Sequence, residues 1–203
     1  MNLEKPSPFL RLFIALAVPP EVGAEIGRAQ ERLKRAAQPG AVRWAVAEQF
    51  HVTLKFLGDV PAEQVARIGD SIAPVCANCP ALRVSARGIG FFPNVVQPRV
   101  IWAGARDETG RLPDLHRQLE AALRWLGPAE KAGRFSGHIT LGRFKPGHHA
   151  SIPKVAGLAA HFHDRHFGDW LAEDVELVRS DLTATGALHT VLAHFALGGP
   201  PPR

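Results

Sequence analysis

The chain alternates between short apolar runs and longer segments in which apolar residues recur every three or four positions. The apolar runs and polar/apolar alternations predict strands at 12–18, 42–46, 50–57, 82–86, 99–103, 138–144, 174–180 and 190–197. Helical spacing predicts helices at 21–36, 61–73, 112–126 and 152–160. A loop rich in glycine, proline and asparagine is expected at 88–98, and a frayed tail at 198–203.

The order of these elements predicts the fold class. Several predicted strands follow one another without a helix between them, which favours antiparallel pairing because parallel neighbours need a long crossover connection. No low-complexity linker divides the chain, and 203 residues are enough for one sizeable core. We therefore expect an α+β fold that forms a single domain over residues 1–203.

Composition narrows the class of protein. A hydrophobic content of 46% and a charged content of 21% are typical of a globular domain rather than a disordered or fibrous chain. The excess of 24 Lys and Arg over 19 Asp and Glu favours an anionic partner: nucleic acid, a phosphorylated small molecule or a membrane surface. Two cysteines exclude a disulfide-stapled scaffold, and the apolar run 13–18 is too short to span a membrane. We expect a cytoplasmic protein with no membrane partner.

One short motif, His-x-Thr-Leu, occurs at 51–54 and again at 138–141, 87 residues later. Because side chains alternate along a strand, the histidine and threonine of each motif share one face, and the two apolar residues enter the core. Two imidazoles on either side of a phosphodiester can act as general acid and general base without a metal. The threonine hydroxyls, with nearby cations such as Lys55 or Arg143, can hold the phosphoryl oxygens.

With these motifs the chain resembles the two-histidine phosphoesterase superfamily. It is most similar to the RNA 2′,3′-cyclic phosphodiesterases, historically called 2′-5′ RNA ligases. The resemblance covers most of the chain and includes 11–15, 42–44, 50–58, 92–93, 98–104, 134–143, 178–182, Gly186 and 195–197.

The resemblance implies both a fold and a reaction. It implies two pseudo-symmetric lobes, each an antiparallel sheet flanked by helices, with an active-site groove between them and no required metal or cofactor. By analogy, His51 donates a proton to the leaving 3′ oxygen, His138 activates water, and Thr53 and Thr140 bind the phosphate. The product is a 2′-phosphomonoester, and the reverse 2′-5′ ligation is also expected, since an enzyme that stabilises one transition state catalyses both directions. The sequence alone leaves open which histidine is the acid.

Two positions depart from the family pattern. Gly137 stands where a proline is common, and His189 stands where a tyrosine is common in a chain that has no tyrosine. These departures call into question the strand entry at Gly137 and the substrate contact made by the side chain at position 189.

Basic and aromatic residues near the motifs supply further candidate contacts with RNA. Arginine and lysine can meet phosphates, and aromatic rings can stack on a terminal base. The candidates are Arg43, Lys55, Arg143, Phe92 and Trp102. The expected partner is RNA or a nucleotide with a 2′,3′-cyclic phosphate, bound by a monomer.

Two other interpretations compete. The cluster His161-Phe162-His163-Asp164-Arg165-His166 favours a metal-dependent hydrolase if His161 and His163 share a strand face. Its aspartate stands one residue too early for the order His-x-His-x-Asp-His, so we expect no metal site. A non-catalytic RNA-binding module is the third interpretation, and it predicts that RNA affinity survives the loss of both motif histidines.

Overall fold

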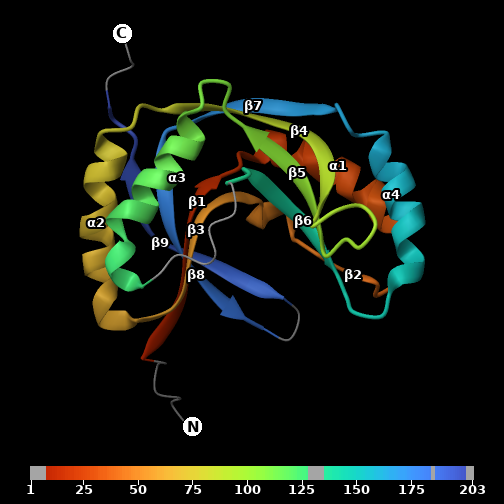
Figure 1. Ribbon diagram of the computed structural model, residues 1–203, viewed down its shortest axis with the longest axis horizontal. Coiled ribbons are helices and arrows are strands. Elements are labelled where there is room, and N and C mark those ends of the chain that lie inside the picture. The colour runs from red at the N-terminus through yellow and green to blue at the C-terminus, as the bar shows by residue number, and fades with distance from the viewer. Residues whose placement is uncertain (1–7, 128–134, 184–185, 200–203) are drawn as a thin grey trace.

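The computed structural model describes residues 8–127, 135–183 and 186–199, and within them the chain forms four α-helices and nine strands (Figure 1). The helices are α1 (Pro20–Ala36), α2 (Val65–Ala77), α3 (Arg111–Ala122) and α4 (Ile152–Ala160). The strands are β1 (Phe9–Ala17), β2 (Val42–Trp44), β3 (His51–Pro61), β4 (Leu82–Phe92), β5 (Val100–Arg106), β6 (His138–Phe144), β7 (His166–Ala172), β8 (Asp174–Leu182) and β9 (Ala187–Ala196). Short 3-10 turns lie at Ala47–Gln49, Ala62–Gln64, Arg124–Leu126 and His149–Ser151.

The nine strands of the described chain pair in the order β7-β4-β5-β6-β3-β1-β8-β9, with β2 beside β6, and every pairing is antiparallel. The order divides at the centre into two halves of four strands. We call β3, β1, β8 and β9 the β3 half-sheet, and β6, β5, β4 and β7, with β2, the β6 half-sheet. Each half-sheet begins at the centre with one motif strand, which agrees with the α+β fold in two related halves expected from the resemblance.

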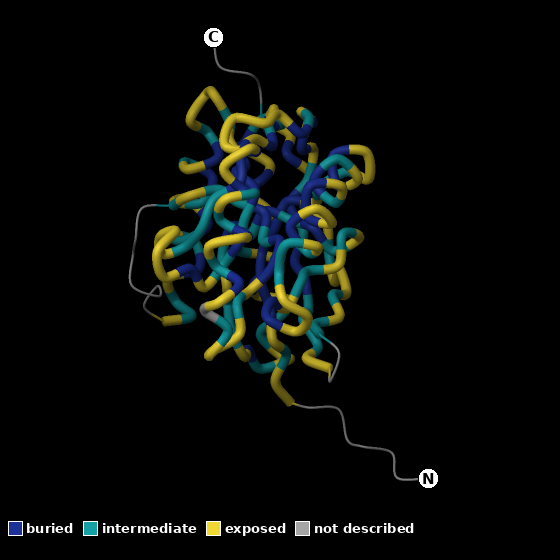
Figure 2. Tube along the Cα trace, turned by 90° about the vertical axis from the view of Figure 1, so that its right-hand side faces the viewer, coloured by how far each residue is buried: buried dark blue, intermediate teal, exposed yellow. Residues whose placement is uncertain are grey.

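Helices cover each half-sheet in pairs. Helices α2 and α3 pack together on the β3 half-sheet, at the left of Figure 1, while α1 and α4 pack on the β6 half-sheet at the right. The apolar residues of these helices and the inward residues of the strands form one main core, which runs through the middle of the molecule as the dark blue segments of Figure 2. None of the described helices is long and apolar enough to cross a membrane.

All eight predicted strands and all four predicted helices are present with shifted bounds. Two features of the β6 half-sheet differ from the prediction. The expected loop at 88–98 begins only after Phe92, because β4 continues through a bulge at Gly88, where φ is 73°. Strand β7 was not predicted at all. Its Gly168 and Asp169 are residue types that strands disfavour, and they interrupt the apolar alternation.

The expected fraying of the tail is wrong for its first two residues. The backbone N–H of Gly198 donates to the carbonyl of Cys76 (3.4 Å), and that of Gly199 donates to Cys79 (3.1 Å). These bonds fasten the end of β9 to the end of α2. Residues 200–203 lie outside the described part of the chain.

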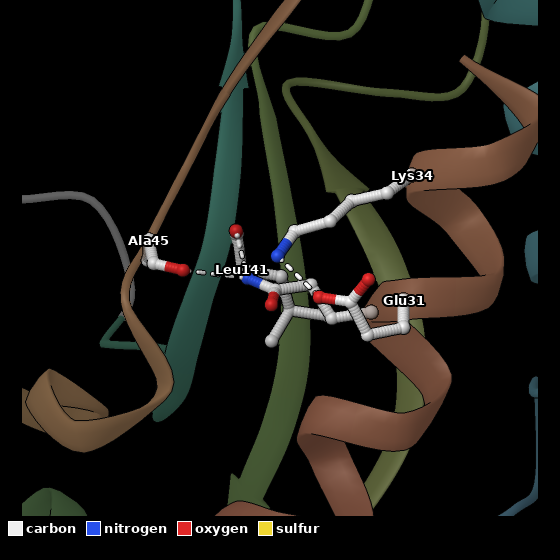
Figure 3. Close-up of polar contacts among 5 residues, drawn as sticks. Glu31, Lys34, Ala45 and Leu141 are labelled. Atoms are coloured by element: carbon white, nitrogen blue, oxygen red, sulfur yellow. Dashed lines mark hydrogen bonds and ion pairs between the residues drawn. The ribbon is translucent and has the colours of Figure 1, made fainter.

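The buried side chain of Gln30 connects α1 to the second motif strand. Its Nε2 donates to the carbonyls of Ala45 and Leu141, each at 2.8 Å (Figure 3). The Leu141 carbonyl also accepts the backbone N–H of Ala45 (2.9 Å). Because Gln30 is only 2% exposed, water cannot replace these bonds. The side chain therefore fixes the segment after β2 against β6, next to the second motif.

We predict that Gln30→Leu lowers the free energy of unfolding by about 1–3 kcal/mol, because it leaves the half-buried Ala45 carbonyl without its donor. The matched control is Lys34→Ala, one turn along α1, which removes an ion pair with Glu31 at the surface (Figure 3) and should cost about 0–1 kcal/mol. Urea unfolding of both variants measures the difference. Equal midpoints for the two variants would show that the Gln30 bonds add nothing to stability.

Candidate active site

The two motifs meet where the half-sheets join. Within the described residues, the register between β3 and β6 consists of one pair, Val52 opposite Ile139. Both side chains are fully buried in the main core. The neighbouring His51, Thr53, His138 and Thr140 therefore lie on the opposite face, which we call the histidine face. In antiparallel register each histidine lies across from the threonine of the other motif, and the two histidines are diagonal neighbours, about 7–8 Å apart in a regular sheet.

A β-bulge follows each threonine. On β3, Ala15 pairs with Thr53 and Ile14 pairs with Lys55, so Leu54 is an extra residue. On β6, Trp102 pairs with Thr140 and Ile101 pairs with Gly142, so Leu141 is the extra residue. The leucine of each motif is thus the bulge residue, and its side chain is buried in the core. Beyond it, the alternation of faces restarts one position later.

The sequence predicts the same role for Lys55 and Arg143, but the bulges place the two side chains on opposite faces of the sheet. Lys55 lies one residue past its bulge and faces the core side, where its Nζ pairs with Glu120 Oε2 on α3 at 2.7 Å and the side chain is only 9% exposed. Arg143 lies two residues past its bulge and shares the histidine face. The structure therefore brings Arg143 to the histidines but not Lys55. The position on β3 that corresponds to Arg143 holds Phe56, which is exposed and lies 6.0 Å from the Phe13 ring.

Both histidines are held in the same way. The Nδ1 of His51 bonds the Gln49 carbonyl, and the Nδ1 of His138 bonds the Ser136 carbonyl, each at 2.8 Å and each two residues back along the chain. A carbonyl can only accept, so Nδ1 carries the proton in both rings. In the neutral tautomer this leaves each Nε2 with a free lone pair. Each ring is thereby oriented to take or give a proton at Nε2.

Burial lowers the pKa of both histidines. For His51 it falls to about 4, chiefly through desolvation, with further lowering by the charges of His189, His138 and Arg143, against an opposing contribution from the Gln49 carbonyl. Desolvation and Arg143 also lower the pKa of His138, again against its carbonyl bond. Among the described acidic groups, none forms an ion pair with either ring. The site consequently favours neutral imidazoles until an anion arrives.

Aromatic rings pack against each histidine. The Phe13 ring lies 4.7 Å from His51 between centroids, and Phe92 lies 5.0 Å from His138, edge to face. Trp102 in turn lies 5.0 Å from Phe92. Its indole Nε1 is buried with no hydrogen-bond partner among the described residues. Of the two aromatic candidates from the sequence, Phe92 contacts the histidine directly and Trp102 supports Phe92.

Arg43 and Arg143 stand directly opposite each other on β2 and β6. Like charges in this position destabilise a sheet. Burial and the neighbouring Arg43 together lower the pKa of the Arg143 guanidinium. Within the described residues neither arginine forms an ion pair. Two guanidinium groups without a carboxylate partner in the described residues therefore lie beside the histidines.

His189 is a site residue whose placement the sequence did not predict. It lies on β9, and its ring is 5.2 Å from His51 and 5.0 Å from Phe13 between centroids, edge to face in both cases. Burial lowers its pKa too. In sequence, His189 was visible only as a departure from the family's tyrosine. Three imidazoles therefore lie close together on the histidine face.

The other departure, Gly137, has a steric reason in this chain. A Cβ atom at this position would lie 2.4 Å from the Ala105 carbonyl oxygen and 3.1 Å from Leu112. The Ala105 N–H also donates to the Gly137 carbonyl (3.0 Å), which keeps the two backbones close. Glycine is thus required where the chain enters β6, because it lets the backbone just before His138 lie close to that of Ala105.

The histidine cluster at 161–166 does not form a metal centre. His161 caps the end of α4 and His163 lies in the turn that follows, so the two do not share the strand face that the metal interpretation requires. His163 pairs with Asp164 (3.0 Å), and His166 opens β7 and pairs with Asp169 (2.9 Å). Across the described residues, no three His, Cys, Asp or Glu side chains are grouped so as to hold a metal ion.

Known proteins are similar to this chain in sequence and in architecture. The family described as LigT like Phosphoesterase matches residues 16–102. An RNA 2′,3′-cyclic phosphodiesterase of Archaeoglobus fulgidus is 31% identical, over 92% of this chain and 99% of its own length. A Thermus thermophilus protein of the same name is 36% identical, over 94% of this chain and 91% of its own length.

Solved structures give the same result for the fold. A crystal structure of a Thermus thermophilus protein superposes with a TM-score of 0.75 at 30% identity, covering 94% of this chain and 99% of that one. E. coli LigT in complex with 3′-AMP has a TM-score of 0.71 at 23% identity, covering 93% and 98%, and supports the fold alone. Relatives above 30% identity along nearly their whole length, together with the shared fold, show that this chain belongs to the LigT-like phosphoesterase family.

Proposed function

We propose that this protein hydrolyses the 2′,3′-cyclic phosphate ends of RNA or nucleotides to 2′-phosphomonoesters, with His51 and His138 as the acid/base pair. One observation carries the proposal: two imidazoles on one face of the sheet, each held through Nδ1 so that Nε2 is free. The names of the family relatives support the same reaction.

The reaction proceeds by in-line displacement at phosphorus. His138 Nε2 takes a proton from water as the water oxygen bonds to phosphorus. The bond from phosphorus to the 3′ oxygen breaks, and His51 Nε2 gives its proton to that oxygen. The histidines exchange protonation states, so one proton transfer through solvent restores them. His51 must enter the cycle protonated, and the phosphodiester anion promotes this by offsetting the cost of burying its charge.

The charge that develops on the phosphoryl oxygens is held by the rest of the histidine face. The Arg143 guanidinium can bond two oxygens at once, which a lysine cannot do in the same geometry. The hydroxyls of Thr53 and Thr140 each lie beside one histidine and can donate to the same group. Arg43, opposite Arg143, adds a second positive charge.

The finer expectations are part of the same proposal. A monomer that acts on RNA or a nucleotide is the expectation that we keep. The two cysteines, Cys76 and Cys79, are free thiols in the described structure, and this supports a cytoplasmic location. Ligation of RNA ends through a 2′-5′ linkage is the reverse of the same reaction.

We predict that His51→Ala and His138→Ala each lower the rate by at least ~100-fold, because each removes a proton-transfer group. The assay is hydrolysis of a short RNA with a 2′,3′-cyclic phosphate, in EDTA, with the 2′- and 3′-phosphate products resolved. The control is His194→Ala, an exposed histidine on β9 that pairs with Asp174 and should leave the rate unchanged.

Three results would contradict this proposal. Turnover only with added zinc or manganese would favour a metal-dependent reaction. A 3′-phosphate product would reverse the assignment of the leaving oxygen. RNA binding that survives both substitutions, with no turnover by the wild type, would leave an RNA-binding module.

We predict that kcat/KM is greatest on the acid side of pH 6.5. The profile reports the pKa values of the free protein, and burial lowers those of both histidines below their usual value. The protonated His51 imidazole that the reaction requires therefore becomes scarce as the pH rises above about 4. His189→Phe removes a charge that lowers the pKa of His51, so the limb set by His51 moves to higher pH. NMR titration of the His51 ring measures the shift directly. A rate maximum above pH 7, or an unmoved His51 titration in the variant, contradicts this electrostatic account.

A further inference from the structure

We propose that Arg87 and Arg106 bind the phosphodiester backbone of an RNA chain whose cyclic phosphate end occupies the histidine pair. This inference rests on the proposed function and adds to it a substrate class. It makes an RNA oligomer, rather than a cyclic mononucleotide, the preferred substrate. We refer to these two residues as the arginine strip.

The strip lies in line with the second motif. His138 pairs with Gly104 on β5, and Gly104 pairs with Arg87 on β4. Directly opposed residues on neighbouring strands share a face, so Arg87 is on the histidine face, two strands from His138. At about 4.8 Å per strand this is a separation of about 10 Å between backbones. Figure 1 shows β6, β5 and β4 side by side in this order.

Arg106 completes the strip. It pairs with Ser85 on β4, which places Arg87 diagonally opposite, about 7–8 Å away in a regular sheet. Both arginine side chains are exposed. Within the described part of the chain neither forms an ion pair. The acid they influence is Asp164, whose pKa their charges lower, but its carboxylate is bound to His163. Two neighbouring guanidinium groups are thus free to meet phosphates.

Glycine backbone and the Trp102 ring lie between His138 and the strip. Gly104 presents no side chain there, and a Cβ atom at that position would lie 3.6 Å from the Trp102 ring. A Cβ atom on Gly90 of β4 would lie only 2.3 Å from the same ring, so the indole lies against the bare backbone of both strands. An aromatic floor leading from a reaction centre to arginines is typical of single-stranded RNA sites, where bases or riboses rest on rings and arginines hold phosphates.

A second basic region of the molecule is less suited to this role. A cavity of about 370 Å³ is lined by Arg28, Arg32, Arg165 and Phe162. Two of its arginines pair with Glu25, and the third lies over the Phe162 ring. Helix α1, which carries Arg28 and Arg32, packs on the core side of the sheet, opposite the histidine face. We therefore do not place the RNA chain on this region, and we use it to choose a control substitution.

The test compares two substrates and two double variants. The substrates are an RNA of about 12 nucleotides that ends in a 2′,3′-cyclic phosphate, and the cyclic mononucleotide alone. The variants are Arg87→Gln with Arg106→Gln, and the control Arg28→Gln with Arg117→Gln, which removes two exposed arginines from α1 and α3. Each double variant lowers the net charge by two, so a general charge effect appears in both.

We expect the strip variant to lose about tenfold in kcat/KM on the RNA and less than about twofold on the mononucleotide. The plot of log kcat/KM against log salt concentration should become shallower by about 1.4, or ~0.7 for each lost phosphate contact to a single strand. The control variant should match the wild type on both substrates.

Equal losses on both substrates, or the same loss in the control variant, would overturn the strip while leaving the proposed reaction intact. If the wild type hydrolyses neither substrate, the proposed reaction fails instead. RNA affinity by fluorescence anisotropy then decides the strip separately. Weaker and less salt-dependent binding in the strip variant alone supports it, and unchanged binding overturns it.

Discussion

The geometry of the site depends on the single backbone pairing between Val52 and Ile139, which joins the two half-sheets in the described structure. Every other pairing lies within one half, so this contact sets how far apart the two histidines stand. A slip of one residue would place the two motifs on opposite faces and turn one of them toward the core, because side chains alternate along a strand. The two fully buried side chains oppose such a slip, since it would expose one of them and bury the imidazole of the same motif. The spacing between the two histidines is thus a consequence of hydrophobic packing.

Sequence periodicity predicts which face each side chain takes correctly up to the threonine of each motif, and fails one residue later. Alternation places His51 and Thr53 on one face, but nothing in His-x-Thr-Leu indicates that Leu54 is an extra residue in its strand. Lys55 therefore looks equivalent to Arg143, although one pairs with α3 and the other shares the histidine face. The sequence pattern also does not reveal which distant strands become neighbours in the sheet. His189 reaches His51 only because β9, β8, β1 and β3 are neighbours in the sheet.

The charged and titratable groups of the site are of the kind that favours an anion. Three imidazoles and Arg143 lie close together, and among the described residues no carboxylate pairs with any of them. Burying such a group costs free energy, and the lowered pKa values of the histidines express that cost. A phosphodiester relieves it, because its charge stabilises both the guanidinium and a protonated imidazole. In the proposed reaction, the free energy that the free protein loses by burying these groups thus favours substrate binding and protonation of a histidine in the complex.

The two half-sheets carry the same residues at the positions proposed for proton transfer. They carry different residues at the positions proposed to contact the two unlike sides of the substrate. Proton donation and proton removal make similar demands, and both halves supply a histidine held by a carbonyl two residues back, a threonine and a leucine bulge. A cyclic phosphate at the end of RNA has a base on one side and a chain of phosphates on the other. Two residues past the bulge, the β3 half-sheet presents Phe56 and the β6 half-sheet presents Arg143. The arginine strip continues that difference outward on the β6 half-sheet alone. In the proposed complex, the residues that differ between the two halves outside the shared motif therefore give the fold a direction along RNA.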